Sequence, residues 1–142
     1  MVNTWGVTPR HSVLSECSRR GRPAVVAGCR DLLSGRGFDA ELLQVLAGPA
    51  AQRVLGGGAG GPGGYWPRVW ALRGLLYAWE DGATGDVVAA LHDESWRVRE
   101  MAAKVVAAQK VTEATTEIIL LQEDHIPRVR RAAGRALMRL ST

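Results

Sequence analysis

Arginine side chains recur at regular positions in this sequence, and they are its clearest chemical feature. Arg68, Arg97 and Arg128 each occupy the same place in three similar segments. Guanidinium groups bind carboxylates and phosphates through paired hydrogen bonds. If the segments are helices stacked about 8–10 Å apart, these cations form a row. Further along the same helices come Lys104, Arg131, Arg135 and Arg139. We expect this face to bind an anionic partner, the alternative being a solvated helix face.

Tryptophan is unusually frequent, with five tryptophans against one phenylalanine. Trp66, Trp70 and Trp96 lie close in sequence to the recurring arginines. A helical face of this kind stacks nucleobases, grips a peptide or packs against the next element. We place these three tryptophans on the candidate binding surface, with Trp70 as the residue of most interest. Burial in the core is the alternative for each of them.

The sequence shows no pattern typical of a catalytic or metal site. His11, His92 and His125 lie far apart, so we expect no metal site. A glycine-rich stretch, 56–64, lacks the Gly-Lys-Ser/Thr ending of a phosphate-binding P-loop and is expected to form a mobile surface loop. No serine or cysteine has a base at a recognised motif spacing. We therefore predict no enzyme activity, no cofactor and no metal.

Three segments that align without gaps position the arginines and tryptophans. They run over 66–74, 95–103 and 126–134, and their shared valines, Val69, Val98 and Val129, are 29 and 31 residues apart. Apolar residues at helical spacing continue the last two segments. Pro67 and Pro127 suit the first turn of a helix. Each segment therefore predicts a helix.

Shorter helices are expected before the last two segments, over 86–91 and 113–122. Each is closed by an acidic turn, Asp93-Glu94 or Glu123-Asp124. This alternation predicts one antiparallel helix pair per repeat and an all-α, short α-α superhelix.

The pattern of an acidic turn followed by Arg-Val-Arg and Ala-Ala resembles the HEAT-like repeat family over about residues 65–140. The resemblance implies a structural ladder between neighbouring repeats, formed by Asp93 with Arg99 and by Asp124 with Arg130. Gly64 and Trp70 replace these two residues in the first segment, so the ladder is expected to stop there. The region from Tyr65 to Val106 is also similar to actinobacterial HEAT-repeat domain proteins, which carry no assigned chemistry.

The N-terminal region is expected to be helical but less regular. Helices are predicted from Pro9 to a stop at Gly21, and over 23–34 and 39–47. We expect a single helical-repeat domain, 1–142. It would comprise an N-terminal helical cap, 1–55, the glycine-rich loop, 56–64, and HEAT-like repeats, 65–142. The cap would cover the apolar end of the stack.

The composition favours a protein with reduced cysteines and without a membrane-spanning segment. Cys17 and Cys29 have no CxxC spacing and are expected to be free thiols. No apolar stretch approaches the roughly 20 residues that span a bilayer, and the N-terminus lacks a signal-peptide pattern. We expect a cytoplasmic protein without membrane contact. The net charge of +4 permits nucleic-acid binding but is modest for it.

The sequence favours a non-catalytic interaction or scaffold module that binds a protein or acidic partner on its arginine- and tryptophan-bearing face. The alternative is a nucleic-acid-binding HEAT-like protein, related to the HEAT-like DNA glycosylases. The chain departs from those enzymes in having about half their repeats. Its only aspartates near the tryptophans, Asp81 and Asp93, resemble turn residues. Self-association through an end of the stack is a further option.

Overall fold

A computed structural model describes residues 6–57 and 64–142, and these residues form helices and turns with no strand. The predicted all-α fold is confirmed. The chain divides into two compact units, Met1–Glu80 and Asp81–Thr142. Most of the predicted glycine-rich loop, residues 58–63, lies outside the described residues.

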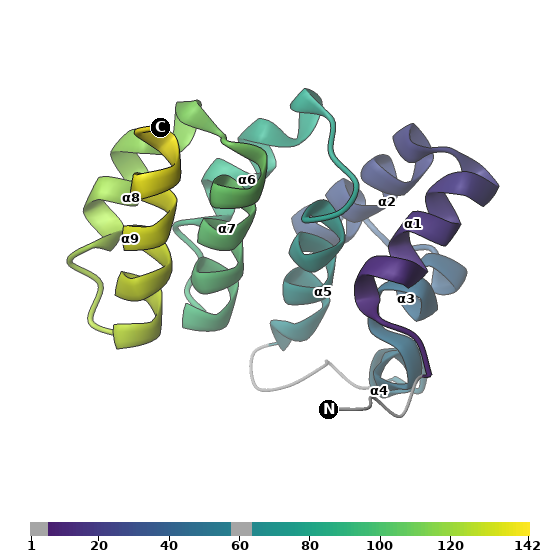
Figure 1. Cartoon of the computed structure of the whole chain (residues 1–142). Coiled ribbons are helices and arrows are strands. Elements are labelled where there is room, and N and C mark those ends of the chain that lie inside the picture. The colour runs from purple at the N-terminus through teal and green to yellow at the C-terminus, as the bar shows by residue number, and fades with distance from the viewer. Residues whose placement is uncertain (1–5, 58–63) are drawn as a thin grey trace. The chain divides into compact units, whose positions relative to one another are not determined.

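The N-terminal unit is built from helices whose ends follow the expected capping residues (Figure 1). Thr8 begins the first helix by accepting a 3.1 Å hydrogen bond from the His11 N–H. Gly35 ends the second with a left-handed φ of 76°. The helices are α1 (Pro9–Arg20), α2 (Arg22–Ser34), α3 (Ala40–Ala47), α4 (Gln52–Leu55) and α5 (Trp66–Leu75).

Helix α5 packs closely against α2 and α3 because glycine allows their backbones to approach. A Cβ added at Gly74 of α5 would lie 2.6 Å from Leu46 Cδ2 and 2.9 Å from Cys29 Sγ. The sequence aligned α5 with the repeat helices of the C-terminal half, but it belongs to the same compact unit as the N-terminal helices. Cys17 and Cys29 are both free, and burial raises the pKa of Cys29 to about 12.

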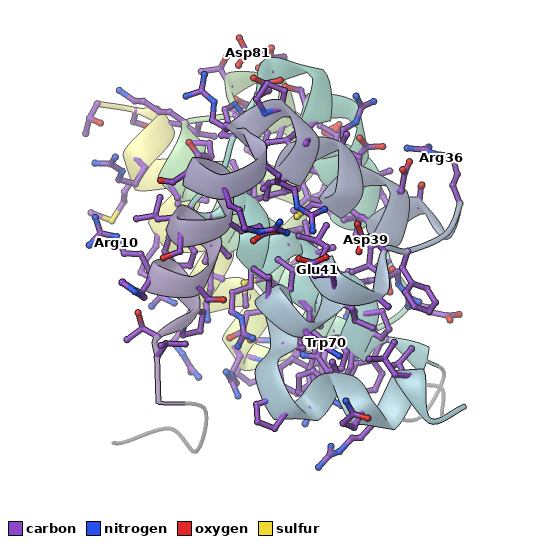
Figure 2. The ribbon with its side chains drawn as sticks, turned by 90° about the vertical axis from the view of Figure 1, so that its right-hand side faces the viewer. Arg10, Arg36, Asp39, Glu41, Trp70 and Asp81 are labelled. Atoms are coloured by element: carbon purple, nitrogen blue, oxygen red, sulfur yellow. The ribbon has the colours of Figure 1, made fainter. Side chains whose placement is uncertain are left out.

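A buried carboxylate organises the polar contacts between α1 and α3. Glu16 is 5% exposed and accepts hydrogen bonds from Arg19 at 2.9 and 2.6 Å, and another from Arg20. The same arginines pair with acids at the start of α3, Arg19 with Glu41 and Arg20 with Asp39 at 2.9 Å. Asp39 and Glu41 can be followed in Figure 2. The hydrogen bonds from Arg19 lead the causes that lower the pKa of Glu16.

The C-terminal unit consists of two helix pairs, as the repeat pattern predicts. The pairs are α6 (Thr84–Ala90) with α7 (Trp96–Gln109), and α8 (Thr115–Leu121) with α9 (Pro127–Leu140). Its most extensive helix contact joins α7 and α9, the second helices of the two repeats. Small alanines are buried along α7 and α9, which lets them pack closely.

None of the helices in the described residues combines the length and the apolar character that crossing a membrane requires.

Candidate functional site

The arginine–aspartate ladder between the two C-terminal repeats is present. It joins an arginine of the earlier repeat to an aspartate of the later one. Arg99 of α7 donates from Nε to Asp124 Oδ2 at 2.8 Å and from Nη2 to Asp124 Oδ1 at 3.2 Å. The Arg99 and Asp124 side chains are 12% and 6% exposed. Within its own repeat, Arg99 donates from Nη1 to the Asp93 carbonyl at 2.8 Å. Arg130 repeats this last bond, to the Asp124 carbonyl at 2.6 Å.

Asp124 is held as a carboxylate by these contacts. Burial alone would raise its pKa, but hydrogen bonds from Arg99 and the Ile126 N–H outweigh burial and keep the pKa below its ordinary value. The pairing differs from the expected one: Arg130 bonds the carbonyl of Asp124, and the Asp124 carboxylate instead binds Arg99 of the preceding repeat. Each arginine bonds the carbonyl of its own turn aspartate.

Trp70 is 5% exposed, so its placement on the binding surface is wrong. Its helix, α5, is an enclosed element in which most residues from Val69 to Leu75 are buried, and the tryptophan ring fills core space (Figure 2). Trp66, at the start of α5, is half-buried. Its ring lies beside that of Tyr65, with centroids 5.2 Å apart.

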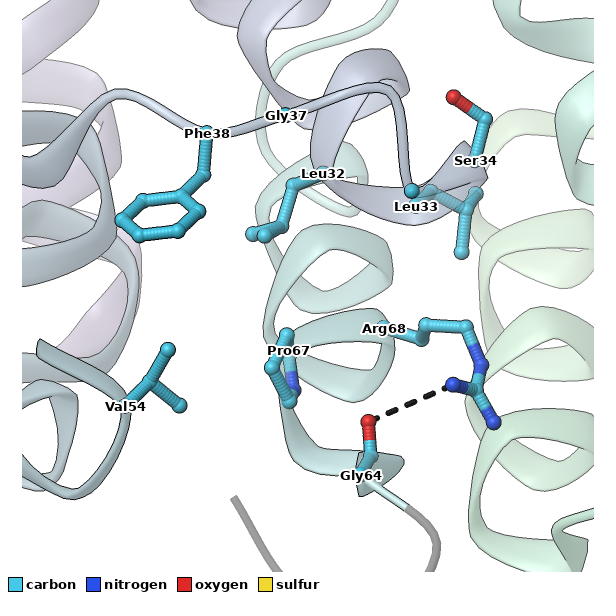
Figure 3. A pocket seen from close by; sticks show the side chains of 10 residues that line it. Leu32, Leu33, Ser34, Gly37, Phe38, Val54, Gly64, Pro67 and Arg68 are labelled. Carbon is cyan, nitrogen blue, oxygen red and sulfur yellow. Dashed lines mark hydrogen bonds between the residues drawn. The ribbon is translucent and has the colours of Figure 1, made fainter. Parts of the chain in front are cut away.

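Arg68 borders an apolar cavity of about 340 Å³ within the N-terminal unit (Figure 3). Leu32, Phe38 and Val54 contribute side chains to its walls, and Arg68 donates from Nη1 to the Gly64 carbonyl at 3.3 Å. Trp66 and Arg68 therefore belong to the N-terminal unit, whereas the other predicted surface residues belong to the C-terminal unit.

Trp96 begins α7, and arginine side chains cover its ring. The Arg97 guanidinium lies 4.4 Å from the ring centroid and that of Arg128 lies 5.2 Å from it. Both distances are within the range of a cation–π interaction. The predicted association of tryptophan and arginine is present, but these contacts occupy the ring.

Glu100, which the sequence analysis missed, receives Arg128. This carboxylate of α7 is 8% exposed and accepts a hydrogen bond from Arg128 Nε of α9 at 2.9 Å. Lys104 Nζ lies 3.9 Å from the same Glu100 oxygen, Oε2. Arg128 is thus a second tie between the repeats, so the row of cations that the sequence predicts for binding an anionic partner includes an arginine already paired with a carboxylate of the chain. The available signal was that Glu100 is the only acid of α7 and lies four residues before Lys104.

A groove of about 310 Å³ lies between α7 and α9. Its cations are Lys104 from α7 and Arg135 and Arg139 from α9, and alanines make up the rest of its lining: Ala107, Ala108 and Ala132. No acidic residue lines this groove. Arg139 Nε lies 3.5 Å from the Ala107 carbonyl, at the outer limit of a hydrogen bond.

Arg131 is a further cation on the exposed side of α9, next to the cations of the groove. Arg131 and Arg135 are exposed, and four residues separate each of the successive positions 131, 135 and 139. This spacing places the three side chains along one side of a helix. We call Lys104, Arg131, Arg135 and Arg139 the cationic face. The described residues contain no group of three or more metal-binding side chains.

The family described as HEAT repeats matches residues 67–142, more than half of the chain. No curated protein and no solved structure shows a significant similarity to the chain.

Proposed function

Since the chain belongs to the HEAT-repeat family, we propose that it is a non-catalytic interaction or scaffold module that binds an acidic protein partner on the cationic face. HEAT repeats generally mediate protein interaction, and the proteins that contain them are typically scaffolds without catalytic activity. The observation that carries the proposal is the groove between α7 and α9, in which three cations surround an alanine lining without an acid.

The charges of the cationic face are weakly compensated by the described part of the chain. Arg135 and Arg131 make no hydrogen bond or ion pair with a described residue. Lys104 is 3.9 Å from Glu100, whose carboxylate Arg128 already holds at 2.9 Å. Like charges in one stripe raise the local positive potential, and an acidic partner would lower it.

The aromatic residues favour a protein partner over a nucleic acid. Sequence-tolerant binding of single strands uses open aromatic rings on which bases stack. Trp70 is buried, and the ring of Trp96 is covered by Arg97 and Arg128. The cationic face therefore offers charge without an open tryptophan platform, which suits carboxylates better than stacked bases.

Binding of labelled poly-glutamate, measured by fluorescence anisotropy at about 50 mM salt, tests the proposal. The double variant Arg131→Gln with Arg135→Gln should bind between about 2-fold and 30-fold more weakly, because two exposed ion pairs of about 0.2–1 kcal/mol each are lost. The matched control is Arg10→Gln with Arg53→Gln. It removes the same charge from exposed N-terminal residues that have no described partner.

An equal loss of affinity in the control variant, or no binding of poly-glutamate by the wild type, would refute the proposal. Duplex DNA of similar charge serves as a competitor. If DNA binds the wild type more tightly than poly-glutamate does, and loses affinity steeply between about 50 and 200 mM salt, the nucleic-acid alternative takes its place.

A further inference from the structure

We propose that the groove between α7 and α9 binds an extended peptide segment that carries acidic side chains at alternate positions. This inference rests on the proposed function and specifies the form of its partner. It adds a requirement for backbone conformation and for the spacing of charges, which a general attraction between opposite charges does not have.

The groove has room for the side chains of a bound peptide. Its volume is about 310 Å³, and its lining includes the short side chains of Ala107, Ala108 and Ala132. These alanines leave space between α7 and α9 into which a bound extended chain can place its side chains.

The spacing of the α9 arginines matches the side-chain repeat of an extended chain. Arg135 and Arg139 are four residues apart, which corresponds to about 6 Å along a helix axis. In an extended chain, every second side chain points to the same side at intervals of about 6.6–6.8 Å. Arg131 adds a third position, at about 12 Å from Arg139 against about 13 Å for the peptide. Three alternate carboxylates thus stay in register with three arginines.

The lining of α7 suits the residues between the acids. Those side chains point away from α9, toward the wall formed by Ala107 and Ala108. Short alanine side chains leave space there for small apolar groups but contribute no hydrogen-bonding group. Lys104 lies on the same wall and adds positive charge to the groove. The expected segment therefore alternates Asp or Glu with small residues.

The cations of the groove can exchange their present contacts for peptide carboxylates at little cost. Arg135 has no described partner, and the Arg139 contact with the Ala107 carbonyl is long at 3.5 Å. Lys104 is similarly distant from Glu100 at 3.9 Å. Arg128, in contrast, holds Glu100 at 2.9 Å, so it is not expected to take part.

Two peptides of identical composition test the spacing. One is Ala-Glu-Ala-Glu-Ala-Glu-Ala, and the other is Glu-Ala-Ala-Glu-Ala-Ala-Glu, which cannot place neighbouring acids on the same side of an extended chain. Seven-residue peptides are too short to form stable helices in water. We expect the alternating peptide to bind between about 2-fold and 30-fold more tightly at about 50 mM salt, equivalent to two further exposed ion pairs.

Two variants connect the preference to the groove. Arg135→Gln with Arg139→Gln should remove the preference, and the control Arg10→Gln with Arg53→Gln should retain it. Ala108→Leu fills the groove at an exposed helix position without changing charge. It should weaken the alternating peptide more than poly-glutamate, because poly-glutamate can also bind Arg131, which lies outside the lining of the groove. Circular dichroism confirms that each variant retains its helices.

Equal affinity for the two peptides, with poly-glutamate still bound through Arg131 and Arg135, would overturn the extended-chain inference and leave the proposed function intact. Tighter binding of a covalently constrained helical peptide with Glu at every fourth position would have the same meaning. If neither peptide nor poly-glutamate binds, both the inference and the proposed function fail.

Discussion

Replacement of Arg99 by alanine should destabilise the C-terminal unit far more than the same replacement of Arg130. Arg99 donates two hydrogen bonds to the Asp124 carboxylate and two to backbone carbonyls, those of Asp93 and Glu94. Removing it leaves a carboxylate that is 6% exposed with the Ile126 N–H as its remaining hydrogen-bond donor among the described residues. Loss of one partner from a buried ion pair typically costs about 3–5 kcal/mol, and the retained bond suggests the lower end of this range.

Arg130 provides the matched comparison because it has the equivalent position in the next repeat. It is exposed, and its described contact is one hydrogen bond to the Asp124 carbonyl. Its loss should cost about 0.5–1.5 kcal/mol. Both variants remove one arginine from a helix, so net charge and helix propensity change equally.

Urea unfolding followed by circular dichroism measures the two free energies of unfolding. A double-mutant cycle with Asp124→Ala isolates the part that belongs to the Arg99–Asp124 pair. We expect a coupling energy of at least about 1 kcal/mol for this pair. The reasoning is refuted if Arg99→Ala and Arg130→Ala cost the same, or if Arg99 and Asp124 show no coupling.

Three other predictions concern stability. The folded-state pKa values of Glu16 and Asp124 are lowered, so their contribution should be fully present above the unfolded pKa of about 4 and lost as pH falls through the folded values. The urea midpoint measured from pH 6 to pH 2 should therefore drop, and a drop in Asp124→Asn as large as that in the wild type would contradict a role for Asp124. Gly74→Ala should destabilise by about 1–3 kcal/mol, because its Cβ would lie 2.6 Å from Leu46 Cδ2, whereas Gly134→Ala in α9 meets no atom within 4 Å and should stabilise by roughly 0.5–1 kcal/mol. Thermal unfolding of the two glycine variants checks the opposite signs. Glu100→Ala leaves Arg128 without its carboxylate and should cost about 1–3 kcal/mol by urea unfolding, with Glu113→Ala, at an exposed acid, as a control close to zero.

The helices could be predicted from the sequence because local signals determine where they begin and end. Thr8 with Pro9 begins α1, Gly35 ends α2, and Pro127 begins α9, each close to the position that capping rules give. The helix pairs of the C-terminal unit followed from the interval between Val98 and Val129. These features depend on residues that are near one another in the chain.

The candidate site was predicted less well because its contacts depend on how neighbouring helices are packed. The pairing of Arg128 with Glu100 joins residues 28 positions apart. The sequence shows both charges, but it does not show how α7 and α9 are aligned, and this alignment brings the two side chains together. Trp70 is buried because most residues of its helix from Val69 to Leu75 are enclosed by neighbouring helices, and the spacing of apolar residues in the sequence does not reveal this. Lys104 and Arg135, which the sequence places further along the two repeat helices, both line the groove between α7 and α9.

The pairing of Arg99 with Asp124 ties the opening of one repeat to the opening of the other. Unravelling of α7 withdraws Arg99 and releases a buried carboxylate in the later repeat. Detachment of α8 and α9 withdraws Arg128 from Glu100 and releases a buried carboxylate in the earlier repeat. Each repeat therefore loses an arginine partner of a buried carboxylate when its neighbour opens, so the two repeats should open together as one cooperative unit.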